Sequence, residues 1–401
     1  MGLRYNRHMS DSNLPEILTR GVEQVLPDTA GLAKLMSEKK IKVYLGIDPT
    51  GNLLTLGHSV VLRKLQQFAE AGHEVILLIG NGTVRIGDPT GRDSTRPELT
   101  DEQIEENFKT WQEQASKILN FDLIKIVHNG DWLDKLTYQD IVKLLAQTTV
   151  QQLLERDMFQ DRLKNGLPIH GHEIMYPLLQ GYDSVVLDVD LELGGSDQLF
   201  NMMMGRQLQR SINNREKFVL TTPIINGTDG RKMSKSYGNF IALTEPANDM
   251  YGKLMSVADG EIVTYLTVLT DLPMAEVNEI EAQLKSGANP MAFKKKLALV
   301  VTEMYHDTEQ ANQAQEHFER TVQNREVPEE MPEVAIKSGT TILEAMQQSL
   351  PEESNSNLRR LLDQGAVSLD EAKVTDGGQA LTQSGILKVG KRRYFKLKVE
   401  E

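Results

Sequence analysis

A first set of residues able to bind a phosphate starts at Asp48-Pro49-Thr50-Gly51 and ends at Thr55-Leu56-Gly57-His58. The set follows an apolar run, and a helical pattern begins at Gly57. The free N–H groups and the dipole of a helix start favour an anion, and His58 can donate to a phosphoryl oxygen. The alternative is an ordinary helix start, since the set matches neither a P-loop nor a dinucleotide-binding fingerprint.

A second set is the basic loop Gly230-Arg231-Lys232-Met233-Ser234-Lys235-Ser236, flanked by Gly227 and Gly238. Two lysines three residues apart on a loop of small residues can clamp a polyphosphate. The glycines would allow the loop to move as a lid. A solvated basic loop is the alternative interpretation.

A third set is Tyr176, Gln180 and Asp183, whose spacing of i, i+4 and i+7 places them on one face of a helix. Apolar residues surround this polar stripe along the chain. Such a stripe is either a satisfied structural network or the wall of a small-molecule pocket.

The fourth set is Gly194-Gly195-Ser196-Asp197-Gln198, which directly follows an apolar run. A glycine pair with a carboxylate at the end of a strand suits the hydroxyl groups of a ribose. The alternative is a strand-to-helix turn in which Ser196 or Asp197 caps the helix.

The elements that must hold these four sets alternate between strands and helices. Short apolar runs predict strands at 42–47, 75–79, 123–127, 188–193 and 218–222. Helical spacing predicts helices at 57–71 and 101–119. This alternation is typical of an α/β fold, a Rossmann-like doubly wound parallel sheet. Ligands of such sheets lie at the carboxyl ends of the strands, where all four sets fall.

Beyond residue 245 the pattern becomes helical and then changes again. Helices are predicted at 247–257, 261–269, 274–285, 290–325 and 357–364, and a hairpin at 386–399. We therefore expect five parts along the chain. They are an N-terminal segment at 1–35, a catalytic domain at 36–244, an all-helical domain at 245–325, an acidic linker at 326–340, and a small α+β unit at 341–401.

Composition limits the possible functions. The 401 residues include 44 Lys and Arg against 57 Asp and Glu, a net charge of −13, so contact with nucleic acid requires local basic patches. There is no cysteine, which excludes disulfides, thiol nucleophiles and cysteine-based metal sites. No long apolar run suits a membrane span. We expect a cytoplasmic protein with no membrane or DNA partner.

In their order along the chain, the four sets resemble the motifs of bacterial-type tyrosyl-tRNA synthetases, a class I aminoacyl-tRNA synthetase family. Thr55-Leu56-Gly57-His58 resembles the His-Ile-Gly-His signature of the class, and residues 232–236 reproduce its Lys-Met-Ser-Lys-Ser signature. The runs that resemble the tyrosine branch are Tyr44-x-Gly-x-Asp-Pro-Thr, Gly87-Asp-Pro-Thr-Gly91, Tyr176-Pro-Leu-Leu-Gln-x-x-Asp183 and Gly194-Gly-Ser-Asp-Gln198. The resemblance extends from about residue 30 to the C-terminus.

The resemblance implies a tyrosine–tRNA ligase reaction in two steps. The carboxylate of L-tyrosine attacks the α-phosphate of ATP to form tyrosyl-adenylate and pyrophosphate, and the terminal ribose of tRNA(Tyr) then takes the tyrosyl group. The residues implied to act on the ATP phosphates are Thr50, His58, Lys232 and Lys235. The implied ATP site comprises Gly46, Asp48, Thr55, Gly57, Gly195, Asp197, Lys232, Met233, Ser234 and Lys235. Mg²⁺ is expected to arrive with ATP, without a metal site on the protein.

The implied tyrosine site comprises Tyr44, Asp88, Tyr176, Gln180, Asp183 and Gln198. In the family pattern Tyr44 and Asp183 hold the phenolic hydroxyl. Asp88, Tyr176 and Gln180 hold the ammonium group, and Gln198 lies near the carboxylate. A pocket built to bind a hydroxyl rejects the analogue that lacks it, so no editing domain is expected.

The resemblance also implies contacts beyond the catalytic domain. Residues 245–325 correspond to an anticodon-binding domain. Its three consecutive lysines at 294–296 are either a basic cluster that contacts RNA or a solvated helix face. The C-terminal unit resembles a small RNA-binding module whose expected tRNA contacts are Arg359, Arg360, Lys388, Lys391, Arg392 and Arg393, with Lys396 beside them. An insert is expected near 130–171. Its segment 151–171 matches the segment that forms the homodimer interface in relatives, with Phe159 and Leu163 as apolar contacts. The alternative is a pair of surface helices.

Three residues depart from the family pattern. Thr55 replaces the first histidine of the signature. Leu45 stands where some relatives carry a polar ribose contact, and Glu192 stands where another branch has a glutamine, which adds a charge of unassigned role. Three alternatives stay open. They are a tryptophanyl-tRNA synthetase, a catalytically weak synthetase-like RNA-binding protein, and another nucleotidyltransferase of the superfamily.

Overall fold

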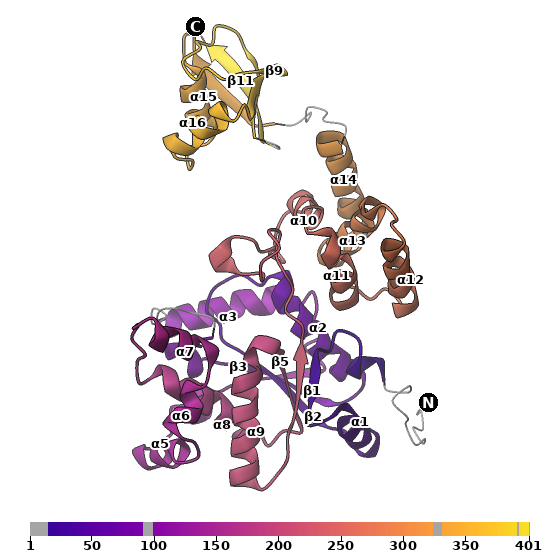
Figure 1. Cartoon of the computed structure of the whole chain (residues 1–401), viewed down its shortest axis with the longest axis vertical. Helices are drawn as coiled ribbons and strands as arrows, with labels where there is room; N and C mark the ends of the chain where they lie inside the picture. The colour runs from indigo at the N-terminus through magenta and orange to yellow at the C-terminus, as the bar shows by residue number, and fades with distance from the viewer. Residues whose placement is uncertain (1–14, 91–98, 324–330, 391–392, 401) are drawn as a thin grey trace. The chain divides into compact units, whose positions relative to one another are not determined.

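The computed structural model describes residues 15–90, 99–323, 331–390 and 393–400 (Figure 1). The chain divides into two compact units, Met1–Ala311 and Asn312–Glu401, which are described separately. No helix of the described residues is long and apolar enough to cross a bilayer.

The first unit contains a six-stranded sheet in the order β1-β6-β5-β2-β3-β4. Its strands are β1 (Gln24–Leu26), β2 (Lys42–Ile47), β3 (Glu74–Ile79), β4 (Ile124–His128), β5 (Leu191–Gly195) and β6 (Phe218–Thr222). All neighbours are parallel except β1, which pairs antiparallel with β6. The strand order reverses between β2 and β5, and such a switch point is where doubly wound folds bind ligands.

The inner strands are apolar runs because both faces of the sheet are covered. In β3 every residue from Val75 to Ile79 is buried. The helices of this part are α1 (Thr29–Glu38), α2 (Leu56–Glu70), α3 (Asp101–Ala115), α8 (Tyr176–Leu187) and α9 (Leu199–Asn213). Helix α2 contacts β2, β3, β5 and β6, so its first turn lies at the end of the switch-point strands.

Helices α8 and α9 lie side by side over most of their length (Figure 1). Glycines allow this close approach. A Cβ added to Gly181 would lie 3.1 Å from the backbone N of Gly205 and 2.9 Å from a methyl carbon of Leu208. Between β4 and α8 the chain forms α4 (Gly130–Leu133), α5 (Tyr138–Leu145), α6 (Val150–Leu154) and α7 (Asp157–Lys164), which occupy the expected insert.

The helical region contains α10 (Ala247–Leu254), α11 (Ile262–Leu269), α12 (Met274–Lys285), α13 (Pro290–Tyr305) and α14 (Thr308–Phe318). The prediction of one helix over 290–325 is wrong. The backbone leaves the helical region at His306, and the Asp307 carboxylate accepts from the backbone N–H of Gln310, which starts α14. The chain continues from α14 into η8 (Glu319–Gln323).

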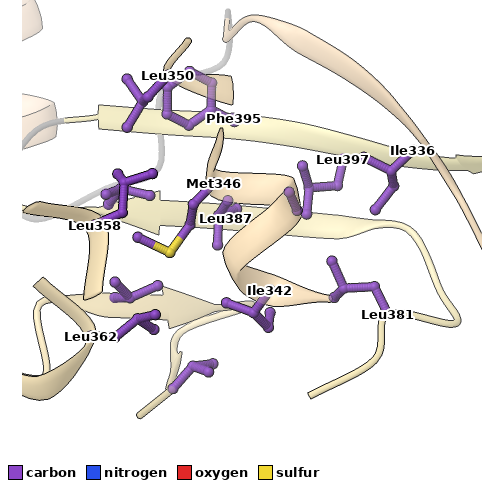
Figure 2. Close-up of a cluster of buried hydrophobic side chains, with 14 residues drawn as sticks. Ile336, Ile342, Met346, Leu350, Leu358, Leu362, Leu381, Leu387, Phe395 and Leu397 are labelled. Atoms are coloured by element: carbon purple, nitrogen blue, oxygen red, sulfur yellow. The ribbon is translucent and has the colours of Figure 1, made fainter. Parts of the chain in front are cut away.

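The second unit ends in a five-stranded sheet in the order β7-β11-β10-β8-β9. The strands are β7 (Glu333–Lys337), β8 (Val367–Leu369), β9 (Ala372–Lys373), β10 (Gly385–Val389) and β11 (Arg393–Glu400). The predicted hairpin is present, since β10 and β11 pair antiparallel from Gly385↔Leu397 to Val389↔Arg393. Helices α15 (Ile342–Ser349) and α16 (Asn355–Asp363) pack on the sheet through one cluster of aliphatic side chains with Met346 and Phe395 (Figure 2).

Sheet membership corrects two of the expected domain limits. The segment 1–35 does not stand apart, because β1 is an edge strand of the catalytic sheet and α1 continues to Glu38. The expected linker 326–340 contains β7, which pairs in parallel with β11. The predicted strand 188–193 starts later, at Leu191, because Asp188 ends α8 in the left-handed conformation.

Helices α10 to α13 belong to the same compact unit as the catalytic sheet, and the division between the two units falls within α14, after Ala311. The Arg20 guanidinium donates to backbone carbonyls of Thr267, Thr270 and Leu272, where α11 ends. Lys117 donates to the carbonyl of Tyr305 at the end of α13. These contacts attach α11 and α13 to the catalytic part, and the boundary expected at 244/245 stays a prediction.

Candidate functional site

A cavity of about 210 Å³ opens at the carboxyl ends of β2, β3 and β5, at the switch point of the sheet. Predicted nucleotide residues on its wall are Gly46, Asp48, Thr50, His58 and Gly195. Predicted tyrosine residues on its wall are Asp88, Tyr176, Gln180, Asp183 and Gln198. The structure thus brings together residues from three of the four sequence sets.

Asp183 is the buried acceptor of this cavity. Its Oδ1 accepts from Trp132 Nε1 at 2.9 Å and its Oδ2 from Asn129 Nδ2 at 3.1 Å. Burial raises the pKa of Asp183 well above its ordinary range, although both hydrogen bonds oppose the shift. A carboxyl group accepts at several lone pairs, so Asp183 can still receive a hydroxyl from a ligand.

Tyr44 does not line the cavity, which differs from the expected grip on a phenol. Its side chain is fully buried, and its hydroxyl lies 2.8 Å from Ser184 Oγ rather than on Asp183. The ring packs beside Ile76 and Leu78 in an apolar cluster. The sequence places Tyr44 on the correct strand, but how deep a side chain lies depends on the packing of neighbouring elements.

Two carboxylates frame the other side of the cavity. Asp48 accepts from Tyr176 Oη at 2.8 Å, and Asp88 accepts from Gln198 Nε2 at 2.8 Å. The Arg156 guanidinium is buried near Asp88, with Nη2 3.7 Å from its Oδ1. Two carboxylates on the wall of one cavity, one of them bonded to a phenol hydroxyl, suit the binding of an ammonium group.

Gln180 faces a residue whose role the sequence left open. Its Nε2 donates to Glu192 Oε1 at 3.1 Å, and Glu192 also lines the cavity. The other oxygen of Glu192 pairs with Lys217, a fully buried lysine directly before β6. Glu192 is therefore a paired carboxylate at the back of the cavity.

Thr55 and His58 contact each other in the first turn of α2. The backbone N–H of Thr55 donates to His58 Nδ1 at 3.1 Å, and Thr55 Oγ1 lies 2.8 Å from the same nitrogen. Because a backbone N–H only donates, Nδ1 accepts, and the neutral ring carries its proton on Nε2. Burial, with a smaller effect of Lys235, lowers the pKa of His58 to about 4. At neutral pH His58 therefore offers one N–H donor.

The two lysines of the basic loop have different surroundings. Lys232 Nζ lies 2.8 Å from Asp197 Oδ2, so the expected ribose acceptor holds a lysine. Lys235 Nζ lies 6.0 Å from the centre of the Trp111 ring and 3.6 Å from where a Cβ on Gly51 would sit. Met233 is buried, and its sulfur lies 3.7 Å from where a Cβ on Gly57 would sit. The loop therefore contacts the first set of residues through Lys235 and Met233.

Asn239 supports this loop, and the sequence did not indicate it. Its Oδ1 accepts from the Ser234 N–H at 2.8 Å, and its Nδ2 donates to the Lys232 carbonyl at 3.0 Å. A Cβ on Gly227 would lie 2.3 Å from the Asn239 carbonyl oxygen, so only glycine fits there. The base of the loop is therefore fixed while Lys232 and Lys235 stay exposed.

Sequence reasoning missed Asn129, Trp132, Ser184 and Lys217 as parts of this region. One signal was available for Trp132. The chain has two tryptophans, and both lie at the cavity, Trp111 on its wall and Trp132 on Asp183. Within the described ranges, no group of three or more His, Cys, Asp or Glu is arranged to hold a metal ion.

Some of the basic residues expected to contact tRNA are exposed, and others form ion pairs with acidic side chains. On the second unit Arg359 and Arg360 are exposed on α16, and Lys388 Nζ lies 4.8 Å from the centre of the Tyr394 ring. Arg393 pairs with Glu353 at 2.7 Å and Lys396 with Glu333 at 3.0 Å. Lys391 and Arg392 lie outside the described residues.

The lysine cluster at 294–296 is also partly neutralised. Lys294 pairs with Asp259 at 2.8 Å, and Lys296 pairs with Glu276. The cluster is therefore a weaker positive patch than three free lysines would form.

Comparison with known proteins is consistent with this geometry. The family model of class I tRNA synthetases for tryptophan and tyrosine matches residues 36–323, and the chain belongs to that family. A tyrosine–tRNA ligase from Thermotoga maritima is 44% identical over 97% of this chain and 98% of its own length. The tyrosine–tRNA ligase 2 of Photorhabdus laumondii is 43% identical over 93% of this chain and 94% of its own length. The resemblance to tyrosyl-tRNA synthetases read from the sequence is confirmed.

Solved structures support the fold. A mitochondrial tyrosyl-tRNA synthetase from Coccidioides posadasii superposes with a TM-score of 0.61 at 23% identity, covering 75% of this chain and 91% of that chain. The tyrosyl-tRNA synthetase of Archaeoglobus fulgidus, solved with L-tyrosine, gives 0.60 at 23% identity and covers 75% and 98%. The predicted class of fold, a parallel α/β catalytic sheet followed by helices and a small C-terminal module, is confirmed.

Proposed function

We propose that this chain activates L-tyrosine with ATP and transfers the tyrosyl group to the 3′-terminal adenosine of tRNA(Tyr). The observation that carries this function is its 44% identity to a tyrosine–tRNA ligase over 97% of the chain. Asp183 on the cavity wall supplies a buried acceptor for the phenolic hydroxyl, and the choice of tyrosine over tryptophan rests on the relatives, which are tyrosine–tRNA ligases. Tryptophan is not favoured as the substrate.

For tyrosine, Asp183 is the proposed acceptor of the phenolic hydroxyl, with Asn129 and Trp132 holding it in place. Asp88, Tyr176 and Gln180 lie along the wall where the ammonium group would sit, and Gln198 lies next to Asp88. Tyr44 would act from behind the wall. A substrate without the hydroxyl would leave Asp183 buried without a ligand donor, which costs binding energy.

For ATP, His58 Nε2–H, Thr50 and the two loop lysines are the proposed phosphate ligands. Gly46, Gly57 and Gly195 leave room for the adenosine, and Asp197 would accept a ribose hydroxyl after Lys232 moves from it to a phosphate. Asp48, Thr55, Met233 and Ser234 would position these groups. Mg²⁺ would enter with ATP on its phosphate oxygens, where it reduces their negative charge.

The reaction requires no nucleophile from the protein, because the substrate carboxylate attacks the α-phosphate itself. The chain contributes orientation of the two substrates and donors for the charge that develops on phosphate oxygens. Lys235 and Lys232 suit this role since they are exposed cations on a loop with a fixed base. Their contribution should be largest in the transition state and small for tyrosine binding.

For tRNA, the proposed contacts are cations of the second unit, chiefly the exposed Arg359 and Arg360 and the half-buried Lys388. Positive side chains gathered on one small unit allow a chain of net charge −13 to bind a polyanion. The residues at 245–325 are proposed to contact the anticodon region.

We also propose a homodimer formed through the insert. Apolar side chains exposed there are Tyr138, Val142, Leu145, Val150, Leu163 and Leu167. Such a concentration is typical of a protein interface. Phe159 is fully buried within its own chain, so it cannot be the contact first expected, whereas Leu163 is 52% exposed. Tyr138→Lys/Leu163→Lys should shift the sedimentation of the protein to that of a monomer, and an unchanged dimer would contradict this interface.

Pyrophosphate exchange into ATP, measured with each of the twenty amino acids in turn, tests the proposed function. Exchange with tyrosine alone is the expected result. Exchange with tryptophan would mean that the pocket has been assigned to the wrong amino acid. No exchange from folded protein would favour an RNA-binding protein without activation chemistry.

A further inference from the structure

A buried ion pair lies directly behind the proposed tyrosine site. Glu192 is the second residue of β5 and Lys217 immediately precedes β6, and these strands are parallel neighbours with Leu191 opposite Phe218. The side chains of Lys217 and Glu192 are 0% and 2% exposed. A pair so deeply buried is weak evidence for stability, because removing both charges from water is costly.

The surroundings of Lys217 are built for its ammonium group. Besides Glu192 Oε2, the ammonium group donates to Ser184 Oγ at 2.8 Å and to the Met202 carbonyl at 3.0 Å. Its three N–H groups therefore have three acceptors. A Cβ on Gly205 would lie 2.5 Å from Nζ and 2.6 Å from Ser184 Oγ, so the absence of a side chain in α9 makes room for this head group.

On the cavity side, Glu192 determines how Gln180 is oriented. A carboxylate only accepts hydrogen bonds, so Glu192 Oε1 takes the amide NH₂ of Gln180, at 3.1 Å. This leaves the amide oxygen of Gln180 as an acceptor that Glu192 does not use. An ammonium group only donates, so this orientation of the amide is the one able to bind the amino group of a substrate.

A second connection runs from Lys217 to Tyr44. Ser184 Oγ accepts from Lys217 and lies 2.8 Å from the Tyr44 hydroxyl. Tyr44 in turn lies fully buried behind the cavity wall. The same lysine therefore orders two polar groups of the tyrosine region, Gln180 through Glu192 and Tyr44 through Ser184.

We propose that Lys217 is a positioning residue that sets the affinity for tyrosine by holding Glu192 as an acceptor and thereby fixing the amide of Gln180. The inference rests on the proposed function, since it assumes tyrosine in this cavity. It assigns a role to Glu192, whose charge had no role in the sequence analysis, and to Lys217, which lies outside the signature motifs.

Three variants test this inference: Lys217→Met, Glu192→Gln and the double variant Lys217→Met/Glu192→Gln. Lys217→Met should raise the KM for tyrosine by about ten- to a hundredfold, the effect of losing one hydrogen bond to a charged group. The KM for ATP and kcat should change little, and the melting temperature should fall. The readouts are tyrosine-dependent pyrophosphate exchange and thermal unfolding.

The double variant separates positioning from stability. It removes both charges of the pair, so its melting temperature should return toward that of the wild type. Its KM for tyrosine should stay raised, because a glutamine at 192 can present either its carbonyl or its NH₂ to Gln180. If the double variant recovers both properties, the pair is only structural and the inference is wrong. Where Lys217→Met does not fold, the double variant alone decides.

Arg215→Met is the matched control. Arg215 pairs with Asp190. Asp190 directly precedes β5 and Arg215 lies three residues before β6, but neither residue lines the cavity. This variant should lower stability and leave the KM for tyrosine unchanged. A wild-type protein without tyrosine-dependent exchange would refute the proposed function. A normal KM in Lys217→Met, with wild-type exchange present, would refute the inference alone.

Discussion

The cavity of the first unit and the surface of the second unit both carry charged residues, but in opposite surroundings. At the cavity, Asp183 is 1% exposed and accepts from two named donors, and Glu192 is paired with the buried Lys217. On the second unit, Lys396 and Glu333 form a pair in which both side chains are about half exposed. The buried groups at the cavity fix the positions of hydrogen-bonding atoms. The exposed groups of the second unit act mainly through their charge.

This difference determines how each region should respond to substitution. A buried polar group that loses its partner costs about 1–3 kcal/mol or more, because water cannot replace the partner. An exposed ion pair contributes about 0–1 kcal/mol and is screened by salt. The cavity should therefore be sensitive to the shape of a side chain, and the second unit should be sensitive to its charge.

The strongest test of the cavity is Asp183→Ala. We expect tyrosine activation to fall by about 10³-fold or more, since the phenolic hydroxyl loses its buried acceptor. Pyrophosphate exchange at varied tyrosine concentration measures the loss. The free energy of unfolding should also fall by about 1–3 kcal/mol, because Asn129 and Trp132 lose their buried acceptor, so thermal unfolding is measured beside the exchange assay. A loss of less than about tenfold would show that Asp183 does not bind the hydroxyl.

Lys235→Ala tests the loop. Activation should slow by about 10²- to 10³-fold in kcat, the usual cost of removing one transition-state donor, with the KM for tyrosine unchanged. Lys285→Ala, which removes an exposed lysine paired with Glu281 on α12, is the control and should have no effect. Lys235→Arg should also be slow, because a guanidinium has a different shape. Full activity of Lys235→Arg would mean that charge alone matters there.

The second unit is tested with Arg359→Ala/Arg360→Ala/Lys388→Ala. The KM for tRNA in charging should rise, and the dependence of tRNA affinity on salt should weaken by a slope of about 1 for each phosphate that the variant no longer binds. Pyrophosphate exchange should not change. Lys388→Arg should retain normal charging, in contrast to Lys235→Arg. A uniform loss of exchange in the triple variant would refute this separation of roles.

The smallest expected effect concerns His58 and pH. Its pKa is lowered to about 4 by burial, so the unfolded chain binds a proton between about pH 6.5 and pH 4 that the folded chain does not. The free energy of unfolding should therefore decrease as pH falls through this window. His58→Gln should lose less stability over the same range, as measured by urea unfolding at pH 6.5 and 4.5. Equal losses in both proteins would contradict a neutral His58 with a lowered pKa.

Periodicity and local motifs predicted much of the fold. The bounds of β2, β6 and α12 agree with the predicted ranges, because each is a run of apolar or helix-forming residues between clear breaks. The three-residue strand β1 was missed, since so short a run carries no periodicity and forms only by pairing with β6. The break between α13 and α14 was missed although residues 306–310 contain no apolar side chain and Asp307, which accepts from the Gln310 N–H, is a residue type that favours a helix start.

The site was predictable where one element carries it and unpredictable where several elements meet. Gln180 and Asp183 follow from helical spacing on α8 alone. The bond from Trp132 to Asp183 and the Lys217–Glu192 pair each join different elements, so they depend on tertiary packing and strand register. The position of Tyr44 behind the wall depends on the same packing.

The most direct test is the ratio of kcat/KM for tyrosine to that for phenylalanine, measured by pyrophosphate exchange with the wild-type protein. The two substrates differ only in the hydroxyl that Asp183 is proposed to accept. A site built to bind a hydroxyl discriminates by about 10⁴- to 10⁵-fold, and tyrosyl-tRNA synthetases are themselves the established example of this range. We expect a ratio in that range. A ratio below about tenfold would contradict a cavity in which Asp183 receives the phenolic hydroxyl.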